Sequence, residues 1–271
     1  MNVFAATGNV QIAYEEAGRG PLICLLHGGM ASSRSWAPVA ESLGNNYHLV
    51  MPDLLGCGGS SPNPENSLKI VPENARALSE LLNHIGKPLV LAGHSLGGTV
   101  AFHLAMQHKL PLKGLVLFEP SLADVLRAVG DAKMLAWHND YFVEGGLKLA
   151  QAGNVAAVRV MVDGWSGEGS FERLPETVQN YLNDQIAAAV GDMEACMNEP
   201  VDVALLKQFA VPALLMAGTS GAQFGATMCR HLAENFPNSA LRLLDDADHS
   251  LTITHADICA QAIESFATNL F

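Results

Sequence analysis

Short apolar runs alternate with longer segments in which apolar residues recur every third or fourth position, up to residue 120 and again after residue 210. The run Leu22–Leu26 (LICLL) is apolar throughout, which is typical of a strand buried on both faces of a parallel sheet. The segment Glu73–Leu82 has the helical spacing instead. Runs of the first kind predict strands at Val10–Tyr14, Leu22–Leu26, Tyr47–Met51, Pro88–Ala92, Gly114–Phe118, Val211–Ala217 and Ala240–Leu244.

Helices are expected in the segments that join these strands. Strands that alternate with helices form right-handed crossover units, which place the strands side by side in parallel. We therefore predict an α/β fold with a mostly parallel sheet of about eight strands, flanked by helices on both faces. The predicted helices are Ser33–Leu43, Asn66–Ile85, Thr99–His108, Thr227–Asn235 and Thr254–Asn269.

The middle third of the chain has a different pattern. Residues 121–209 are rich in Ala, Met and Leu at helical spacing, and Gly164–Gly169 and Pro175 are expected to break the helices. We predict that residues 1–120 and 210–271 form the α/β core and that residues 121–209 form a helical cap inserted into it. The apolar residues of this insertion either form the wall of an apolar pocket or pack as the core of the cap itself. They are Met134, Trp137, Tyr141, Phe142, Met161 and Trp165.

The composition excludes several classes of protein. Hydrophobic residues make up 49% and charged residues 15%, the opposite of a disordered chain. The net charge is −12 and there is no basic stripe, so nucleic acid is not expected as a partner. No apolar run has the length that a bilayer requires, so no membrane association is expected. The chain itself does not indicate an oligomeric state.

The cysteines and the first residues point to a reducing compartment. The five cysteines are an odd number, and no two have the spacing of a metal site, which favours buried, inert thiols. Met1–Gln11 contains no basic segment followed by an apolar one, as a secretion signal would. We expect a cytoplasmic protein.

The segment Gly93–Gly98 (GHSLGG) carries the clearest candidate chemistry. It matches the G-x-S-x-G pattern, follows a predicted strand and opens a predicted helix. Gly93 and Gly97 lack a Cβ, so the strand and the helix can approach closely. The turn would lift the Ser95 hydroxyl above the carboxyl edge of the sheet and aim the Leu96 N–H at a developing oxyanion. The alternative is a glycine-rich turn with an N-capping serine, which the strand–turn–helix context disfavours.

Taken together, four segments resemble an α/β-hydrolase over essentially the whole length of the chain. They are His27-Gly28-Gly29, Asp53–Ser60 (DLLGCGGS), the turn at Ser95 and Asp248-His249. The resemblance implies that the backbone N–H of Gly29, or of its neighbour Met30, is the second donor to the oxyanion. We expect His27 to brace that loop by hydrogen bonds, and Asp53 and Ser60 to brace their own loop.

Ten histidines compete for the role of general base. The resemblance places the base on a late loop after a strand, which is the position of His249. His255 is the rival, but it falls within the predicted helix that follows. His94 adjoins Ser95 in sequence, so its side chain is expected to leave the turn in another direction. No HExxH or comparable spacing is present, so we expect no metal and no cofactor.

The acidic partner of the histidine departs from the family pattern. The resemblance implies an aspartate after the strand Val211–Ala217, yet Gly218–Phe224 contains no carboxylate and Gly221 stands at the expected position. Glu119 ends the strand Gly114–Phe118, and some α/β-hydrolases place their acid there. We predict that Glu119 contacts His249. The alternatives are that Asp248 or Asp245 orients the imidazole, or that Glu119 only braces the insertion.

These residues predict a serine hydrolase that acts on a small-molecule substrate. Ser95 would attack a small or medium, mainly apolar ester, and His249 would accept its proton on the way to an acyl-enzyme. One rival is hydrolysis of a carbon–carbon bond, thioester, lactone or amide at the same site. The other is a ligand-binding protein of the same fold that turns over slowly or not at all.

Overall fold

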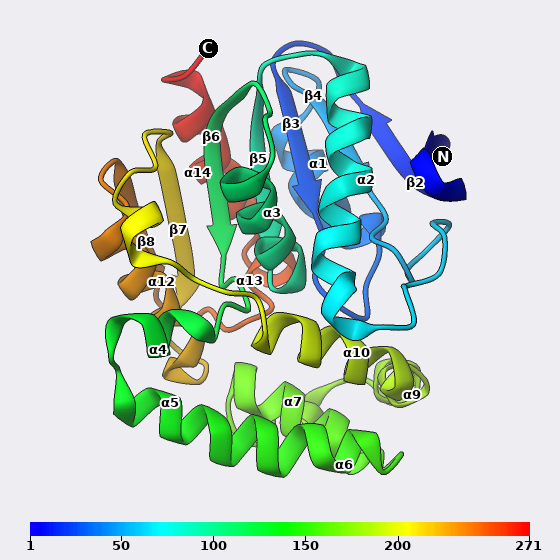
Figure 1. Ribbon diagram of the computed structural model, residues 1–271, viewed down its shortest axis with the longest axis vertical. Coiled ribbons are helices and arrows are strands. Elements are labelled where there is room, and N and C mark those ends of the chain that lie inside the picture. Colours follow the sequence, from blue (N-terminus) through cyan, green and yellow to red (C-terminus); the bar gives the residue numbers. More distant parts are fainter.

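The predicted sheet is present, and it has eight strands (Figure 1). The computed structural model describes residues 1–271. The strands are β1 (Asn2–Ala6), β2 (Val10–Ala17), β3 (Leu22–Leu26), β4 (His48–Pro52), β5 (Leu89–His94), β6 (Leu112–Phe118), β7 (Ala213–Gly218) and β8 (Ser239–Leu244). Their order in the sheet is β1-β2-β4-β3-β5-β6-β7-β8. Strand β2 pairs antiparallel with both β1 and β4, and all the other neighbours are parallel.

Strand β1 is the one that the apolar pattern did not predict. It lies at the edge of the sheet and pairs with β2 from Asn2 opposite Tyr14 to Ala6 opposite Val10. Most of its residues are exposed, and Val3 keeps 56% of its surface accessible. Its apolar run, Val3–Ala6, is short and only Ala6 is buried, so the ladder of backbone hydrogen bonds to β2 is the main contact that holds this strand.

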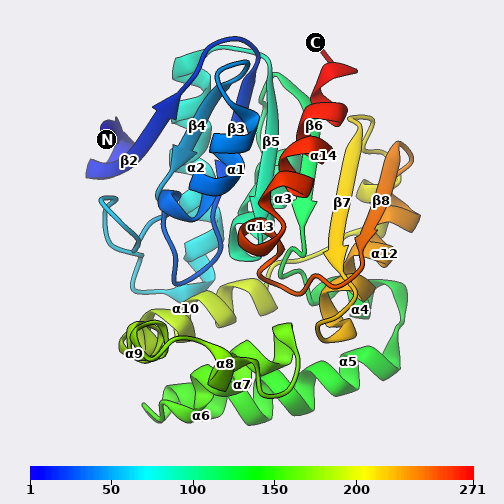
Figure 2. The ribbon, with the colours of Figure 1, turned by 180° about the vertical axis from the view of Figure 1, so that it is seen from behind.

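Helices cover both faces of the sheet (Figures 1 and 2). Alternate side chains of β3 enter two separate cores: Leu22, Cys24 and Leu26 enter one, and Ile23 and Leu25 enter the other. This double burial is the physical reason for the unbroken apolar run. The first core is covered by α2 (Ile70–Ile85), α3 (Leu96–Gln107) and α12 (Gln223–Asn235), and the second by α1 (Ala37–Leu43) and α14 (Ala256–Thr268).

All five predicted helices differ in detail from the observed ones: α3 and α12 begin earlier than expected, and the helix predicted at Ser33–Leu43 opens with a 3-10 segment. The helix predicted at Thr254–Asn269 is two helices, α13 (Leu251–Thr254) and α14, separated at His255. The helix predicted at Asn66–Ile85 opens with a 3-10 turn, in which the Asn66 side chain accepts a hydrogen bond from the Leu68 N–H. The 3-10 segments of the chain are Thr7–Asn9, Ser33–Trp36 and Ser67–Lys69.

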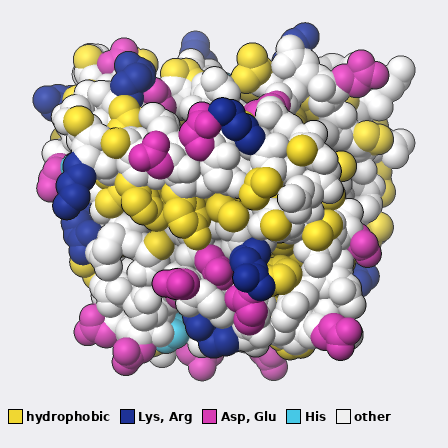
Figure 3. Space-filling view, turned by 90° about the horizontal axis from the view of Figure 1, so that it is seen from below, with side chains coloured by type: hydrophobic (Ala, Val, Ile, Leu, Met, Phe, Trp, Pro, Cys, Tyr) yellow, Lys and Arg dark blue, Asp and Glu magenta, His cyan; other side chains and the backbone are white.

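The chain between β6 and β7 is helical and lies across the carboxyl ends of the parallel strands (Figure 1). We call residues 124–206 the helical layer. Its outer face carries a band of hydrophobic side chains between charged ones (Figure 3). The layer consists of α4 (Asp124–Val129), α5 (Ala132–His138), a π-helical segment (Asn139–Leu147), α6 (Lys148–Gln151), α7 (Ala156–Ser166), α8 (Ser170–Arg173), α9 (Glu176–Asp184), α10 (Ile186–Met197) and α11 (Val203–Leu206).

The helix break predicted at Gly164–Gly169 is present and falls at Gly167, whereas Gly164 itself is still helical. Helix α7 continues to Ser166 and ends at Gly167, where φ is 98°. Gly164 is buried, and a Cβ there would come within 2.6 Å of the rings of Phe142 and Tyr141. This glycine permits close packing of two helical segments, a role that its sequence context does not reveal.

The cysteines are all free, and four of the five are buried. Cys57 is the exception to the predicted burial, because it lies partly exposed on the loop after β4. Burial raises the pKa of the Cys196 thiol to about 12. No helix combines the length and the apolar character needed to cross a membrane.

The register of the sheet places the ends of the parallel strands at one edge. Gly93 of β5 lies beside Leu26 of β3, and His94 lies beside Phe118 of β6. In β7, Gly218 lies beside Leu244 of β8. The residues that follow these strands therefore gather beneath the sheet, where the helical layer covers them.

Candidate active site

Ser95 occupies the sharp turn between β5 and α3. Its backbone has φ 53° and ψ −122°, a left-handed conformation that is unfavourable for a residue with a side chain. A Cβ at Gly93 would lie 2.2 Å from the Gly97 carbonyl oxygen, and one at Gly97 would lie 2.3 Å from that of His27. The two glycines are therefore required by the close approach of strand and helix, as their pattern in the sequence predicts.

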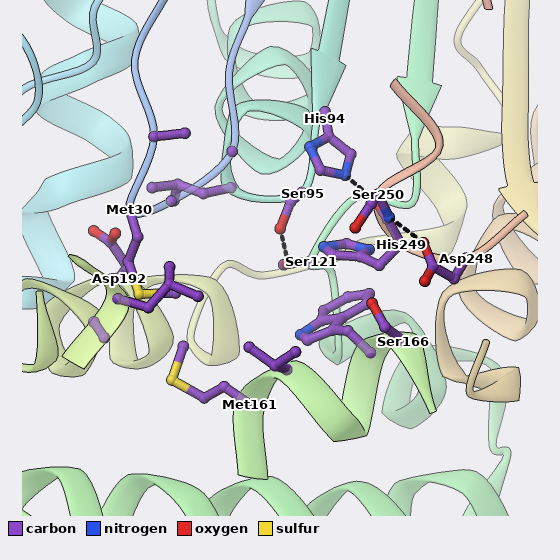
Figure 4. A pocket seen from close by; sticks show the side chains of 18 of the residues that line it. Met30, His94, Ser95, Ser121, Met161, Ser166, Asp192, Asp248, His249 and Ser250 are labelled. Carbon is purple, nitrogen blue, oxygen red and sulfur yellow. Dashed lines mark hydrogen bonds between the residues drawn. The ribbon is translucent and has the colours of Figure 1, made fainter. Parts of the chain in front are cut away.

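The Ser95 hydroxyl faces a cavity of about 520 Å³ between the sheet and the helical layer (Figure 4). It lies 3.3 Å from the hydroxyl of Ser121, and either oxygen can be the donor. His249 lines the same cavity, but no hydrogen bond joins it to Ser95 in this structure. To act as a nucleophile, Ser95 must direct its proton to the imidazole, and its oxygen can still accept a hydrogen bond from Ser121.

His249 is hydrogen-bonded to Glu119, as we expected from the missing aspartate. The distance from His249 Nδ1 to Glu119 Oε2 is 2.7 Å. The other carboxylate oxygen, Oε1, accepts a hydrogen bond of 2.8 Å from the Gly218 N–H. A carboxylate at Nδ1 stabilises the tautomer that has its proton there, which leaves Nε2 free to accept a proton. The Glu119 side chain is 3% exposed, so this contact is shielded from water.

Two backbone features, one at Glu119 itself and one on α12, make space for the Glu119 side chain. Glu119 itself has φ 41°, so the chain turns sharply where β6 ends. On α12, a Cβ at Gly225 would lie 2.5 Å from Glu119 Oε2. Because Gly225 has no side chain, it leaves a space that the carboxylate fills. Nothing in the sequence around Gly225 indicates this, because the contact joins residues far apart in the chain.

The usual position of the acid, after β7, has no space for a side chain. A Cβ at Gly221 would lie 2.8 Å from the Trp165 carbonyl oxygen. The same Trp165 oxygen accepts a hydrogen bond of 3.2 Å from the Ala222 N–H. The loop after β7 is thus bound to the helical layer, and a carboxylate reaches His249 from β6 instead.

The other carboxylates near His249 have different partners. Asp248 Oδ1 accepts a hydrogen bond of 2.8 Å from the Ser250 N–H and so begins the next turn of helix (Figure 4). Asp245 is exposed and lies 3.4 Å from the Thr219 hydroxyl. The rival base, His255, is bonded to the Thr254 hydroxyl at 2.9 Å and does not line the cavity. Of the residues considered, Ser95, His249 and Glu119 are the ones that the fold brings together.

Aromatic side chains enclose the His249 ring. Trp165 of α7 stacks on it with a centroid distance of 4.0 Å and an interplanar angle of 27°. Burial lowers the pKa of His249, so the imidazole is neutral at pH 7 and can act as a base. Burial raises the pKa of Glu119, and the hydrogen bond from the Gly218 N–H opposes this rise.

His94 supports the loop that carries His249. Its Nε2 lies 2.8 Å from the His249 carbonyl oxygen, and the two rings are 4.6 Å apart. The side chain does turn away from Ser95, as expected, but we did not predict that it would contact the His249 loop. Burial lowers the pKa of His94 to about 3, so its ring is neutral and donates from Nε2.

The loop after β3 provides the remaining polar groups. Gly29 and Met30 both line the cavity, and Met30 has φ 54°. His27 braces this loop, because its Nδ1 lies 2.7 Å from the Gly28 oxygen and its Nε2 accepts from the Leu54 N–H at 2.9 Å. Beside this loop, α3 begins at Leu96, whose N–H belongs to the unpaired first turn of the helix.

Asp53 and Ser60 hold the loop after β4, as predicted. Asp53 accepts hydrogen bonds from the N–H groups of Ser33 and Gly59 at 2.8 and 2.9 Å. The Ser60 hydroxyl donates to the Asp53 carbonyl oxygen at 2.7 Å and accepts from the Ala13 N–H at 2.9 Å. Neither residue lines the cavity.

All six of the apolar residues proposed for the pocket wall or the cap core belong to the buried core or pack against it. Phe142, Met161 and Trp165 also line the cavity, whereas Met134, Trp137 and Tyr141 do not. No group of three or more His, Cys, Asp or Glu side chains is arranged to hold a metal ion.

Comparisons with known proteins agree with this geometry. Residues 21–256 match the family described as the alpha/beta hydrolase fold. The pimeloyl-(acyl-carrier protein) methyl ester esterase of Vibrio cholerae is 26% identical over 270 residues, which cover 94% of this chain and 97% of that protein.

Two solved structures have the same fold. A thermophilic esterase from Thermogutta terrifontis has a TM-score of 0.72 at 22% identity, and the match covers 99% of this chain and 98% of that one. A bromoperoxidase from Bacillus anthracis has a TM-score of 0.76 at 21% identity, with 97% of each chain covered. Proteins with different names share this fold, so the reaction of this chain has to be inferred from the residues of its candidate active site.

The room at Gly225 leads to a first prediction. Replacing a glycine by alanine inside a helix normally stabilises a protein by about 1 kcal/mol. Gly225→Ala should instead lower the free energy of unfolding, because the new methyl group displaces the buried carboxylate of Glu119. It should also remove the downfield N–H proton resonance of His249, measured by NMR. Gly145→Ala is the matched control, since a Cβ there meets its nearest neighbour at 3.5 Å. Retention of the His249 resonance in Gly225→Ala would contradict the prediction.

Proposed function

Because the chain belongs to the alpha/beta hydrolase fold family, we propose that it is a serine hydrolase that cleaves an ester through an acyl-enzyme on Ser95. The observation that carries the proposal is the 2.7 Å contact between His249 Nδ1 and the buried carboxylate of Glu119, beside a serine on a strained turn. The esterase name of the Vibrio cholerae relative supports an ester as the substrate.

In the first step, Ser95 Oγ attacks the carbonyl carbon of the ester while His249 Nε2 takes the hydroxyl proton. The imidazolium that forms is stabilised by the Glu119 carboxylate at Nδ1. The electron pair of the carbonyl bond moves to its oxygen, which becomes an oxyanion. The N–H groups of Leu96 and Gly29 are the proposed donors to it, since preorganised donors of this kind lower the barrier by about 2.7–4 kcal/mol each.

In the second half, the oxyanion collapses and the bond to the alcohol oxygen breaks. His249 gives its proton to the departing alcohol and leaves Ser95 acylated. Water then enters, loses a proton to His249 and attacks the acyl carbon. Collapse of this second intermediate releases the acid and returns the proton to Ser95.

The cavity limits the size and character of the substrate. Its volume is about 520 Å³, and the side chains of Phe142, Met161 and Trp165 give it an apolar wall. A small or medium acyl ester of mainly apolar character fits this space, and the helical layer acts as the cap that encloses it.

The proposed nucleophile leads to a second prediction. Ser95→Ala should lower kcat for the hydrolysis of p-nitrophenyl esters by about 10⁴- to 10⁶-fold, since the residue that is acylated is lost. A fluorophosphonate probe should label the wild-type protein and not this variant, as measured by mass spectrometry. The Ser121→Ala variant, which removes the hydroxyl that contacts Ser95 Oγ, should still be labelled at Ser95. An unlabelled wild-type protein would favour the rival reading as a ligand-binding protein.

The two acidic residues next to His249 lead to a third prediction. Glu119→Gln keeps the shape of the side chain but removes the charge that stabilises the imidazolium, so kcat should fall by on the order of 10⁴-fold. Asp248→Asn is the matched control. It retains the oxygen that accepts from the Ser250 N–H, and its kcat should stay within a few-fold of the wild type. Equal losses in the two variants would show that Glu119 has no special role.

The enclosure of His249 leads to a fourth prediction, on pH. The rate should fall on acidification as His249 gains a proton, and burial lowers its pKa, so the midpoint of kcat/KM should lie below the ordinary value of 6.5. Trp165→Ala admits water, stabilises the charged ring and should move the midpoint upward. Trp137→Ala, which removes a tryptophan of the same layer away from the cavity, should not. A common shift in both variants would indicate a general disturbance of the layer.

A further inference from the structure

Asp192 is a buried carboxylate that the proposed reaction does not use. It belongs to α10 in the helical layer, is 8% exposed and lines the same cavity as Ser95. In Figure 4 its side chain points toward Met30, and Ser95 lies between Asp192 and His249. The carboxylate is therefore on the side of the nucleophile that faces away from the general base.

No cation neutralises this carboxylate. Asp192 forms no salt bridge, and no side chain donates a hydrogen bond to it; the polar group that faces it is the Met30 backbone N–H. Its ionisable neighbours are the thiols of Cys57 and Cys196, whose pKa values are raised to about 12, so neither is a cation. Burial raises the pKa of Asp192 to about 7, and the Met30 N–H opposes this rise. The Met30 N–H uses only part of the acceptor capacity of this carboxyl group, and the group lines the cavity, where a donor on a substrate can bind it.

The loop after β3 leaves room for the carboxylate. A Cβ at Gly29 would lie 2.9 Å from Asp192 Oδ2, so the carboxylate rests against the backbone of the residue proposed to bind the oxyanion. A substrate whose carbonyl oxygen lies at Gly29 therefore places the neighbouring carbons close to Asp192.

The direction of the reaction decides which part of the substrate lies there. His249 must protonate the departing alcohol, so the alcohol oxygen lies on the His249 side of Ser95. The acyl chain then extends to the opposite side, which is the side of Asp192 (Figure 4).

We propose that Asp192 determines specificity by accepting a hydrogen bond from a hydroxyl or N–H group on the acyl chain, one or two carbons from the scissile carbonyl. The preferred substrates are thus hydroxyacyl or aminoacyl esters rather than plain alkanoate esters. A site with a buried acceptor rejects the analogue that lacks the donor, because the acceptor is then left unpaired. The inference rests on the proposed ester hydrolysis and adds the class of acyl group.

The test compares methyl butyrate with methyl 2-hydroxybutyrate and methyl 3-hydroxybutyrate, whose hydrolysis is followed by acid release. The wild-type protein should prefer at least one hydroxy ester by about tenfold or more in kcat/KM. Asp192→Leu should reduce this ratio to about one, and Asp192→Asn, which keeps one acceptor oxygen, should give an intermediate ratio. The ratio is informative because a purely structural defect in α10 would slow all three esters equally. Equal rates for the three esters in the wild type, or an unchanged ratio in Asp192→Leu, would overturn the proposal.

Calorimetry in the Ser95→Ala background separates this inference from the proposed function. That variant should bind the preferred hydroxy ester more tightly than methyl butyrate, and the added Asp192→Leu change should abolish the difference. Hydrolysis of methyl butyrate by the wild type without any preference in rate or binding would refute the role of Asp192 alone. Preferential binding without hydrolysis of any ester would refute the proposed function and leave Asp192 as a ligand-binding residue.

Discussion

The contact between Glu119 and His249 is the interaction on which the rest of the site depends. It requires a carboxylate to be buried at the end of β6, where a charge without partners would be strongly destabilising. Two contacts offset this cost: the Gly218 N–H binds one oxygen and His249 Nδ1 binds the other. Gly225 supplies the empty space on α12. Strand, helix and loop must all be in place before the imidazole is oriented, so the site is a property of the assembled sheet.

The helical layer contributes to this electrostatic arrangement as well as to the shape of the cavity. Trp165 contacts the His249 ring with its side chain and occupies the space beside Gly221 with its carbonyl group. Trp165 thus shields His249 from water and fills the position after β7 at which the family resemblance implied an aspartate. A displacement of α7 would change both the solvation of His249 and the packing of the loop after β7.

Much of this could be read from the sequence, and the remainder has a common physical cause. The apolar runs located seven of the eight strands, and the absence of a carboxylate after the strand Val211–Ala217 was enough to predict the contact between Glu119 and His249. Strand β1 was not predicted because an edge strand buries few side chains. The roles of Gly225 and Asp192, and the contact of Trp165 with His249, were not predicted because they depend on contacts between elements distant in the chain. A single glycine, tryptophan or aspartate in a helical pattern carries no sign of the neighbour it will meet in the folded protein.

The position of the acid also bears on how such a site can evolve. Returning the carboxylate to residue 221 would require the Trp165 carbonyl to move, since the two cannot occupy the same space. Removing Glu119 alone would leave the cavity at Gly225 unfilled and the Gly218 N–H without its acceptor. No single substitution therefore connects the two arrangements through a fully packed intermediate. A lineage that has moved its acid to β6 and closed the position after β7 is held there by epistasis, and its descendants should retain the glycines at 221 and 225 together with Glu119.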